Sequence, residues 1–310
     1  MLQELIKLVI SYMLLSIQIG SCTRAVKELN KELFEHWDDT LRASVPAITY
    51  FIQNYLHNYN AKYMDASVRM ALSQMKLIST AFFWVVYLDI DLSPLQWIAL
   101  TLQLTGATLV QMDRKTKRGE ESRMAQRMEF LMALHAAPEA DSKEQRIIIG
   151  LMIELSGVLI SGFSAAYWER LLKRRRKVSI WLRNTELAFF SIPLSFATIL
   201  LTQDDGIKLF KDGSLIYFDS IYWITIALRA LVGLSVGLAI KFGSSLLKAF
   251  TGSIASVFFG IIAIFAFKFI PTNQFFQGAF LSLIAPIIFT AFPPEQEKFK
   301  PRKSVHFLDV

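Results

Sequence analysis

Cysteine is almost absent from this sequence of 310 residues. Cys22 is its single cysteine, so neither an intrachain disulfide nor a metal site built from several cysteines can form. The four histidines (His36, His57, His135 and His306) are too scattered along the chain to predict a set of metal ligands. We therefore expect the protein to need no metal.

Several sequence motifs that carry catalytic chemistry are also missing. The sequence has no P-loop, no H-E-x-x-H, no G-x-S-x-G and no pair of aspartates inside an apolar segment. An ATP-driven pump and an intramembrane hydrolase are therefore poorly supported. Secondary transport needs none of these motifs, and we predict that the protein is not an enzyme.

Charged residues are scarce as well, at 19% of the chain against 53% hydrophobic residues. A soluble domain of this size carries more charge. The formal net charge is +7, but the basic residues lie mostly in short connections and in the tail. Membrane topology and phosphate-bearing solutes explain this excess better than nucleic acid does.

Apolar segments recur from one end of the chain to the other. Each is about 20 residues long, the length that a helix needs to cross a bilayer. Residues 2–20 have the length of a signal peptide, but Glu4 stands where a basic region is expected, so we interpret them as a retained span. We predict an all-α, polytopic bundle of about nine spans. They lie near residues 2–20, 42–60, 66–88, 93–112, 146–171, 178–202, 220–240, 244–268 and 273–292.

The polar connections predict the orientation in the membrane. Residues 173–177 are all basic, and residues 293–310 form a polar tail that includes further lysines and an arginine. By the positive-inside rule, both belong on the cytosolic side, and an odd number of spans then puts Met1 on the lumenal side. Residues 22–41, a mixed-charge surface helix or loop, fall on the cytosolic side, and the long polar stretch 113–145 falls opposite.

One predicted span carries a line of polar side chains. Arg69, Ser73, Lys76 and Thr80 recur at the spacing of one helix face. Such a face does not suit lipid, so it lines a wet cavity or pairs with neighbouring helices. For Lys76, near the middle of the span, we favour a role in binding an anion.

Two other charged residues leave the alternatives open. Lys248 and Glu169 lie near the ends of their predicted spans, where long side chains often extend to the membrane surface. This interpretation and a role in a polar cavity have equal support from the sequence.

Many short segments of the sequence form a recognisable series. They are Val45–Ala47, Tyr50, Gln53–Asn54, Met64–Ala66, Gln74–Lys76, Leu92–Ser93, Leu95–Trp97, Gly106, Gln111, Gly162–Ser164, Tyr167–Glu169, Leu172–Lys173, Trp181–Asn184, Lys241, Leu247–Phe250, Pro271–Thr272 and Phe275–Ala279. Their order and spacing resemble the nucleotide-sugar transporter family of the drug/metabolite transporter superfamily. The resemblance covers almost the whole chain and is strongest for the branch that carries UDP-N-acetylglucosamine, UDP-galactose and CMP-sialic acid.

The resemblance implies ten helices in two inverted five-helix repeats, with the substrate bound between them near the middle of the membrane. Met1 matches the start of the family's second helix, so the family's first helix has no counterpart in this sequence. The first repeat then covers residues 1–112 and the second covers residues 146–292. The polar stretch 113–145 connects them, and the cytosolic tail 293–310 follows.

The resemblance also implies a function and a site. It predicts a Golgi antiporter that imports a UDP-sugar, UDP-N-acetylglucosamine or UDP-galactose, in exchange for UMP and without a cofactor. The endoplasmic reticulum is the alternative compartment. The family's substrate cavity matches Tyr50, Asn54, Lys76, Asn184 and Lys248, and the polar face described above adds Arg69 and Ser73.

The expected partners are the nucleotide sugar, the nucleoside monophosphate and membrane lipid, with homo- or hetero-oligomers of related transporters as an option. No nucleic acid is expected. A rival hypothesis is a divergent membrane scaffold or partner subunit that keeps the transporter fold without transporting. The sequence does not decide which sugar and base are carried.

Overall fold

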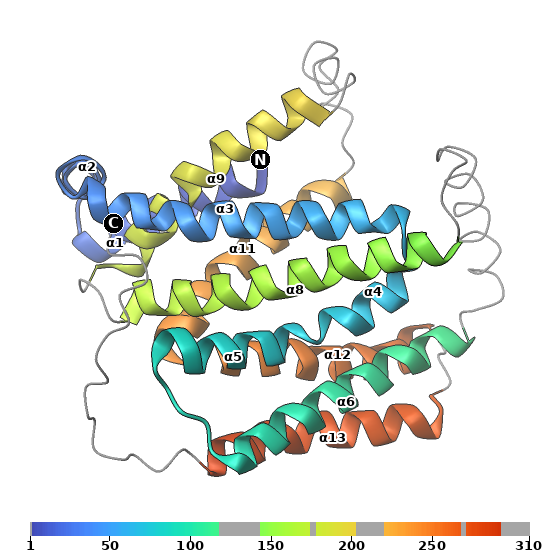
Figure 1. The fold of residues 1–310 in the computed structure, drawn as a ribbon. Coiled ribbons are helices and arrows are strands. Elements are labelled where there is room, and N and C mark those ends of the chain that lie inside the picture. Colours follow the sequence, from blue (N-terminus) through green and yellow to red (C-terminus); the bar gives the residue numbers. More distant parts are fainter. Residues whose placement is uncertain (1, 118–142, 174–177, 203–219, 268–270, 293–310) are drawn as a thin grey trace.

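The computed structural model describes residues 2–117, 143–173, 178–202, 220–267 and 271–292 (Figure 1). The described residues contain helices and no strand, which confirms the predicted all-α class. In chain order the helices are α1 (Leu2–Ile19), α2 (Cys22–Asn30), the π-helix η1 (Lys31–Glu35), α3 (Trp37–Tyr59), the 3-10 helix η2 (Asn60–Lys62), α4 (Ala66–Ser73), α5 (Lys76–Leu88), α6 (Pro94–Lys117), α8 (Lys143–Lys173), α9 (Ile180–Thr202), α11 (Ser220–Phe242), α12 (Ser245–Phe267) and α13 (Asn273–Ala291).

Every apolar segment expected to span the membrane is helical in the structure. Within the described ranges, six helical segments are long and apolar enough to cross a membrane: α1, the α4–α5 segment, α8, α11, α12 and α13. The remaining expected spans, α3, α6 and α9, are 23, 24 and 23 residues long. At 1.5 Å per residue each extends roughly 35 Å, which is enough to cross the hydrocarbon core.

The predicted connections are partly described. Pro94 is the first residue of α6, as expected from its fixed φ angle. Asp89, which follows α5, adopts the left-handed conformation (φ 52°) that ends many helices. The ends of the polar stretch 113–145 are helical, since α6 extends to Lys117 and α8 begins at Lys143. Residues 118–142, the basic residues 174–177 and the tail 293–310 lie outside the described residues.

The expected single helix over residues 66–88 is divided in two. α4 ends at Ser73 and α5 begins at Lys76, and the hydrogen bonds between them span three residues instead of four. The N–H of Met75 donates to the carbonyl oxygen of Leu72 (2.9 Å), and that of Leu77 donates to Gln74 (3.1 Å). Such tightening in the middle of a span often marks a hinge or a functional site.

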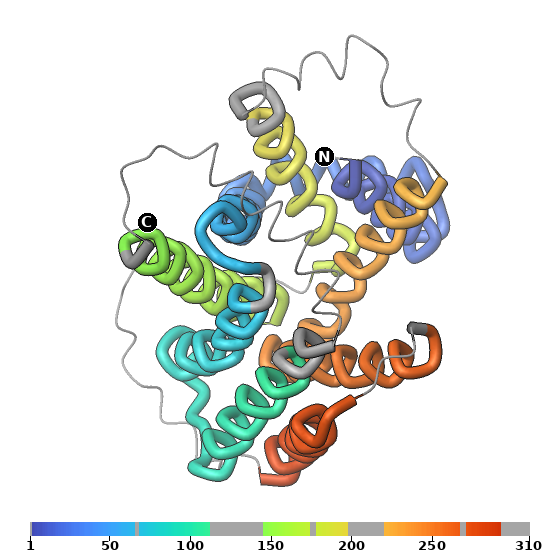
Figure 2. Tube along the Cα trace, turned by 90° about the vertical axis from the view of Figure 1, so that its right-hand side faces the viewer, coloured from blue at the N-terminus to red at the C-terminus, as the bar shows by residue number. Residues whose placement is uncertain are grey.

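Helices α6 and α13 pack along each other more extensively than any other pair in the described ranges (Figure 2). Two glycines allow the backbones to touch. A Cβ atom added at Gly278 would lie 2.7 Å from the carbonyl oxygen of Gly106, and one added at Gly106 would lie 2.7 Å from Ser282 Oγ. Small residues at a helix crossing are typical of membrane proteins.

The largest apolar core holds four helices together near one end of the bundle. It contains residues of α5, α6, α12 and α13. Outside the core, α11 and α12 turn several large aromatic and aliphatic side chains outward, as lipid-facing helices do. The buried members of this core are Leu77, Ala81, Ala99, Leu100, Leu246, Phe250, Ala285 and Phe289.

Candidate functional site

The helix break between α4 and α5 positions the first residue of the predicted site. Lys76 is the first residue of α5, directly after the tightened turn. Its side chain is exposed, while Leu77, the next residue, is buried in the core shared with α12 and α13. The backbone at Lys76 is therefore fixed by the packing of its neighbour.

Lys248 lies in the first turn of α12, on the other side of this core. Two hydrogen bonds fix that turn. Ser244 Oγ accepts from the N–H of Leu247 (3.0 Å), as an N-cap residue does, and Glu169 of α8 accepts from the N–H of Ser245 (2.8 Å). Lys248 is partly exposed.

The two lysines come together although 172 positions separate them in the sequence. Helices α5 and α12 are in contact, and the positive charge of Lys76 acts unfavourably on that of Lys248. Such repulsion is relieved when an anion enters between two cations. Two neighbouring cations of this kind can hold a phosphate or diphosphate group.

Three of the other predicted site residues lie on a second pair of packed helices, α3 and α9. Tyr50 and Asn54 are on α3, and Asn184 is on α9, where it is 2% exposed. The hydroxyl of Tyr50 and the amide nitrogen of Asn184 are buried without a hydrogen-bond partner in the structure. The amide of Asn184 lies close to Gly237 of α11, where a Cβ atom would be 3.3 Å from its Oδ1.

Arg69 and Ser73 lie on α4, before the helix break. Arg69 donates to the carbonyl oxygen of His57 (2.8 Å), at the end of α3, and Ser73 Oγ donates to that of Met70 (2.8 Å). Thr80, the last member of the predicted polar face, is buried, and its Oγ1 donates to the carbonyl oxygen of Lys76 (2.7 Å). The structure thus places these residues in different surroundings because the helix does not continue regularly through residues 74–75.

Glu169 does not extend to the membrane surface, which was one of the two alternatives for it. Its side chain is 2% exposed, and besides Ser245 it accepts hydrogen bonds from Trp84 Nε1 (2.9 Å) and Lys173 Nζ (2.7 Å). Lys173 also donates to the carbonyl oxygen of Gly243. Glu169 therefore joins α8, α5 and the beginning of α12, and it supports the turn that carries Lys248.

A buried ion pair on α1 was missed by the sequence analysis, which considered Glu4 only as evidence against a signal peptide. Lys7 Nζ lies 2.8 Å from Glu4 Oε2, and Lys7 is 6% exposed. Its aliphatic stem lies against Gly233 of α11, where a Cβ atom would be 3.1 Å from the stem. Opposite charges three residues apart in an apolar helix were the signal that could have indicated this pair.

Known proteins with similar sequences were found over most of the chain. A family model described as nucleotide-sugar transporter matches residues 1–290. The UDP-galactose/UDP-N-acetylglucosamine transporter srf-3 of Caenorhabditis elegans is 31% identical over 290 residues, covering 94% of this chain and 72% of that protein. The UDP-N-acetylglucosamine transporter of Homo sapiens is 28% identical over 291 residues, covering 92% of this chain and 82% of that protein.

Proposed function

Because this chain belongs to the nucleotide-sugar transporter family and is a multi-pass membrane protein, we propose that it is a Golgi antiporter for UDP-sugars. It imports UDP-N-acetylglucosamine or UDP-galactose, the substrates named for its relatives, in exchange for UMP. The exchange uses no cofactor, because the outgoing nucleotide drives the incoming one.

The pair formed by Lys76 and Lys248 carries this proposal. A diphosphate placed between the two ammonium groups replaces their mutual repulsion by two charge-assisted contacts. The single phosphate of UMP can bind the same two lysines, so the two nucleotides can exchange at one site. The break before Lys76 allows the site to change shape, as discontinuous helices do in other transporters.

Tyr50, Asn54 and Asn184 are proposed to bind the base and the sugar. Buried polar groups normally have a hydrogen-bond partner, and the Tyr50 hydroxyl and the Asn184 amide are available for a substrate. Arg69 and Ser73 remain proposed members of the site on the α4 side of the helix break.

The packing of the helices supports the proposed nine spans in two inverted repeats, α1 to α6 (1–112) and α8 to α13 (146–292). If α1, α3, α5 and α6 correspond to α9, α11, α12 and α13, two pairs of contacts are equivalent. The contact between α3 and α9 is then equivalent to the contact between α11 and α1. The contact between α5 and α6 is likewise equivalent to the contact between α12 and α13. All four contacts are present in the structure.

Ligand-dependent thermal stability tests the proposed function. Purified protein in detergent should melt at a higher temperature with UDP-N-acetylglucosamine, UDP-galactose or UMP, and at an unchanged temperature with free N-acetylglucosamine. A ligand at 100 times its Kd stabilises the folded state by about 2.7 kcal/mol. If no nucleotide changes the melting temperature of well-folded protein, the chain is a non-transporting scaffold and our proposal is wrong.

A further inference from the structure

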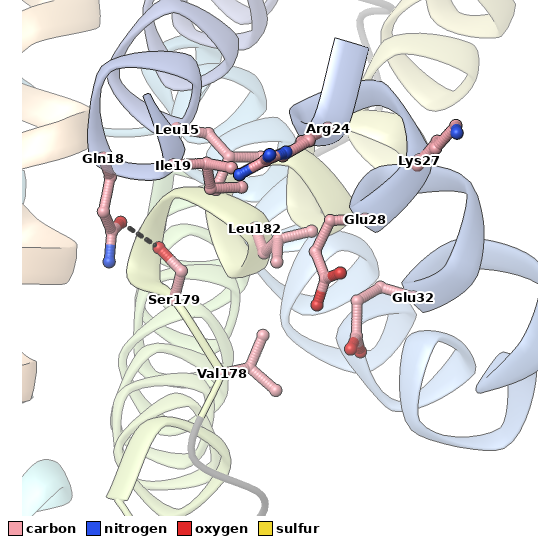
Figure 3. A pocket seen from close by; sticks show the side chains of 10 residues that line it. All are labelled: Leu15, Gln18, Ile19, Arg24, Lys27, Glu28, Glu32, Val178, Ser179 and Leu182. Atoms are coloured by element: carbon pink, nitrogen blue, oxygen red, sulfur yellow. Dashed lines mark hydrogen bonds between the residues drawn. The ribbon is translucent and has the colours of Figure 1, made fainter. Parts of the chain in front are cut away.

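A pocket of about 470 Å³ lies away from the lysine pair, where α1 ends and α9 begins (Figure 3). Helix α2 and the π-helix η1 form its other walls. Its volume is within the range of small-molecule sites. The lining residues are Leu15, Gln18, Ile19, Arg24, Lys27, Glu28, Glu32, Val178, Ser179 and Leu182.

Both charge signs meet in this pocket. Arg24 and Lys27 of α2 provide two cations, and Glu28 and Glu32 provide two anions. Figure 3 shows the two carboxylates near each other on one side, with the Arg24 guanidinium beside the apolar residues Leu15 and Ile19. Glu28 is exposed at the mouth, whereas Glu32 is 2% exposed.

The remaining wall is apolar and is held in place. Leu15 and Leu182 are 1% and 3% exposed and belong to the cluster that joins α1, α2 and α9. Ser179 Oγ donates to Gln18 Oε1 (2.7 Å), which ties the end of α1 to the beginning of α9. A ligand in this pocket therefore meets charged groups at the mouth and an aliphatic surface below them.

The charges select among ligand classes. The carboxylates of Glu28 and Glu32 lie near each other in Figure 3, so this side of the pocket favours a cation. Within the described ranges, no three acidic, histidine or cysteine side chains gather as a metal site would require, so an organic ammonium group suits the two carboxylates better than a metal ion. Arg24 in turn suits a phosphate.

The position of the pocket relative to the membrane also indicates which ligand it binds. α1 is long and apolar enough to span the bilayer, so its end reaches the headgroup region, where α2 exposes Arg24 and Lys27. We propose that this pocket binds the headgroup of phosphatidylethanolamine. The ammonium lies between Glu28 and Glu32, the phosphate at Arg24, and the upper acyl chain against the half-buried Ile19 and Val178.

This inference does not depend on the transport function. It distinguishes phosphatidylethanolamine from phosphatidylcholine, whose quaternary ammonium has no N–H to donate to the carboxylates. It also excludes phosphatidylglycerol, whose net negative charge is repelled by Glu28 and Glu32. The free headgroup, phosphoethanolamine, has the same charges without the acyl chains.

The test uses the purified, delipidated full chain in detergent micelles. Phosphatidylethanolamine, phosphatidylcholine, phosphatidylglycerol or soluble phosphoethanolamine is added, and the melting temperature is followed against ligand concentration. We expect phosphatidylethanolamine alone to raise the melting temperature. Glu28→Gln and Glu32→Gln should each weaken its apparent affinity about 10- to 100-fold, the effect of losing one charged hydrogen bond.

Glu35→Gln is the matched control, because Glu35 is exposed on the same π-helix and does not line the pocket. It should keep the affinity of the original protein. If Glu32→Gln fails to fold, Glu28→Gln at the exposed mouth decides. An equal response to phosphatidylcholine, an unchanged response in Glu28→Gln, or full saturation by phosphoethanolamine would overturn the proposal.

Discussion

Replacing both Lys76 and Lys248 by alanine is expected to abolish measurable binding of a UDP-sugar while the protein stays folded. A charged hydrogen bond contributes about 1.5–3 kcal/mol, so each single variant should lose about one to two decades in affinity. The double variant should lose about two to four decades. Folding should not suffer, because Lys76 is exposed, Lys248 is partly exposed, and their removal ends a repulsion.

The control for this prediction is Lys62→Ala. Lys62 is an exposed lysine whose ammonium lies over the ring of Tyr59, and it is not one of the proposed site residues. The Lys62→Ala variant should bind UDP-N-acetylglucosamine with the affinity of the original protein, as measured by isothermal titration calorimetry. Lys76→Arg should be intermediate, since a planar fork does not replace a point charge. Unchanged affinity in the double variant would show that the lysine pair does not hold the diphosphate.

Arg183→Met is expected to be the most destabilising single change at a buried charge. Arg183 is 1% exposed, and its guanidinium donates to Asp39 Oδ2 (2.5 Å) and to Glu186 Oε2 (2.8 Å). Removing it leaves two largely buried carboxylates without their shared partner, which typically costs about 3–5 kcal/mol. We expect a large drop in melting temperature and poor recovery after detergent extraction.

Charge balance explains this effect, so restoring the balance should reverse part of it. Arg183→Met combined with Asp39→Asn and Glu186→Gln should recover a substantial part of the melting temperature. Arg146→Met is the control, because Arg146 donates a single exposed hydrogen bond, to the carbonyl oxygen of Lys62 (3.1 Å). If the melting temperature of Arg183→Met equals that of Arg146→Met, the buried ion cluster does not stabilise the fold.

The helices themselves were predictable, because apolar runs of membrane length leave the backbone no other way to satisfy its hydrogen bonds. All nine expected segments are helical, and α6 begins at Pro94 as predicted. The division of residues 66–88 was not predictable. No proline or glycine marks residues 74–75, so the tightened turn depends on packing between elements that are distant in sequence.

The sequence proposes a set of site residues but says nothing of how they are arranged. Lys76 was singled out by its depth in a span, and Lys248 by the family resemblance, but no local pattern says that they face each other. The same holds for Glu169, whose partners Trp84 and Ser245 come from two other helices. Nor does the sequence reveal the pocket beside α2, since it forms only where α1, α2, η1 and α9 meet.

Counterflow in proteoliposomes tests the central claim most directly. Vesicles that hold the purified protein are loaded with UMP and supplied with radiolabelled UDP-N-acetylglucosamine or UDP-galactose outside. We predict rapid accumulation of at least one of these labels, which disappears in empty vesicles, in vesicles without UMP and in the Lys76→Ala/Lys248→Ala variant. Well-folded protein that accumulates neither label above the level of empty vesicles would contradict the account.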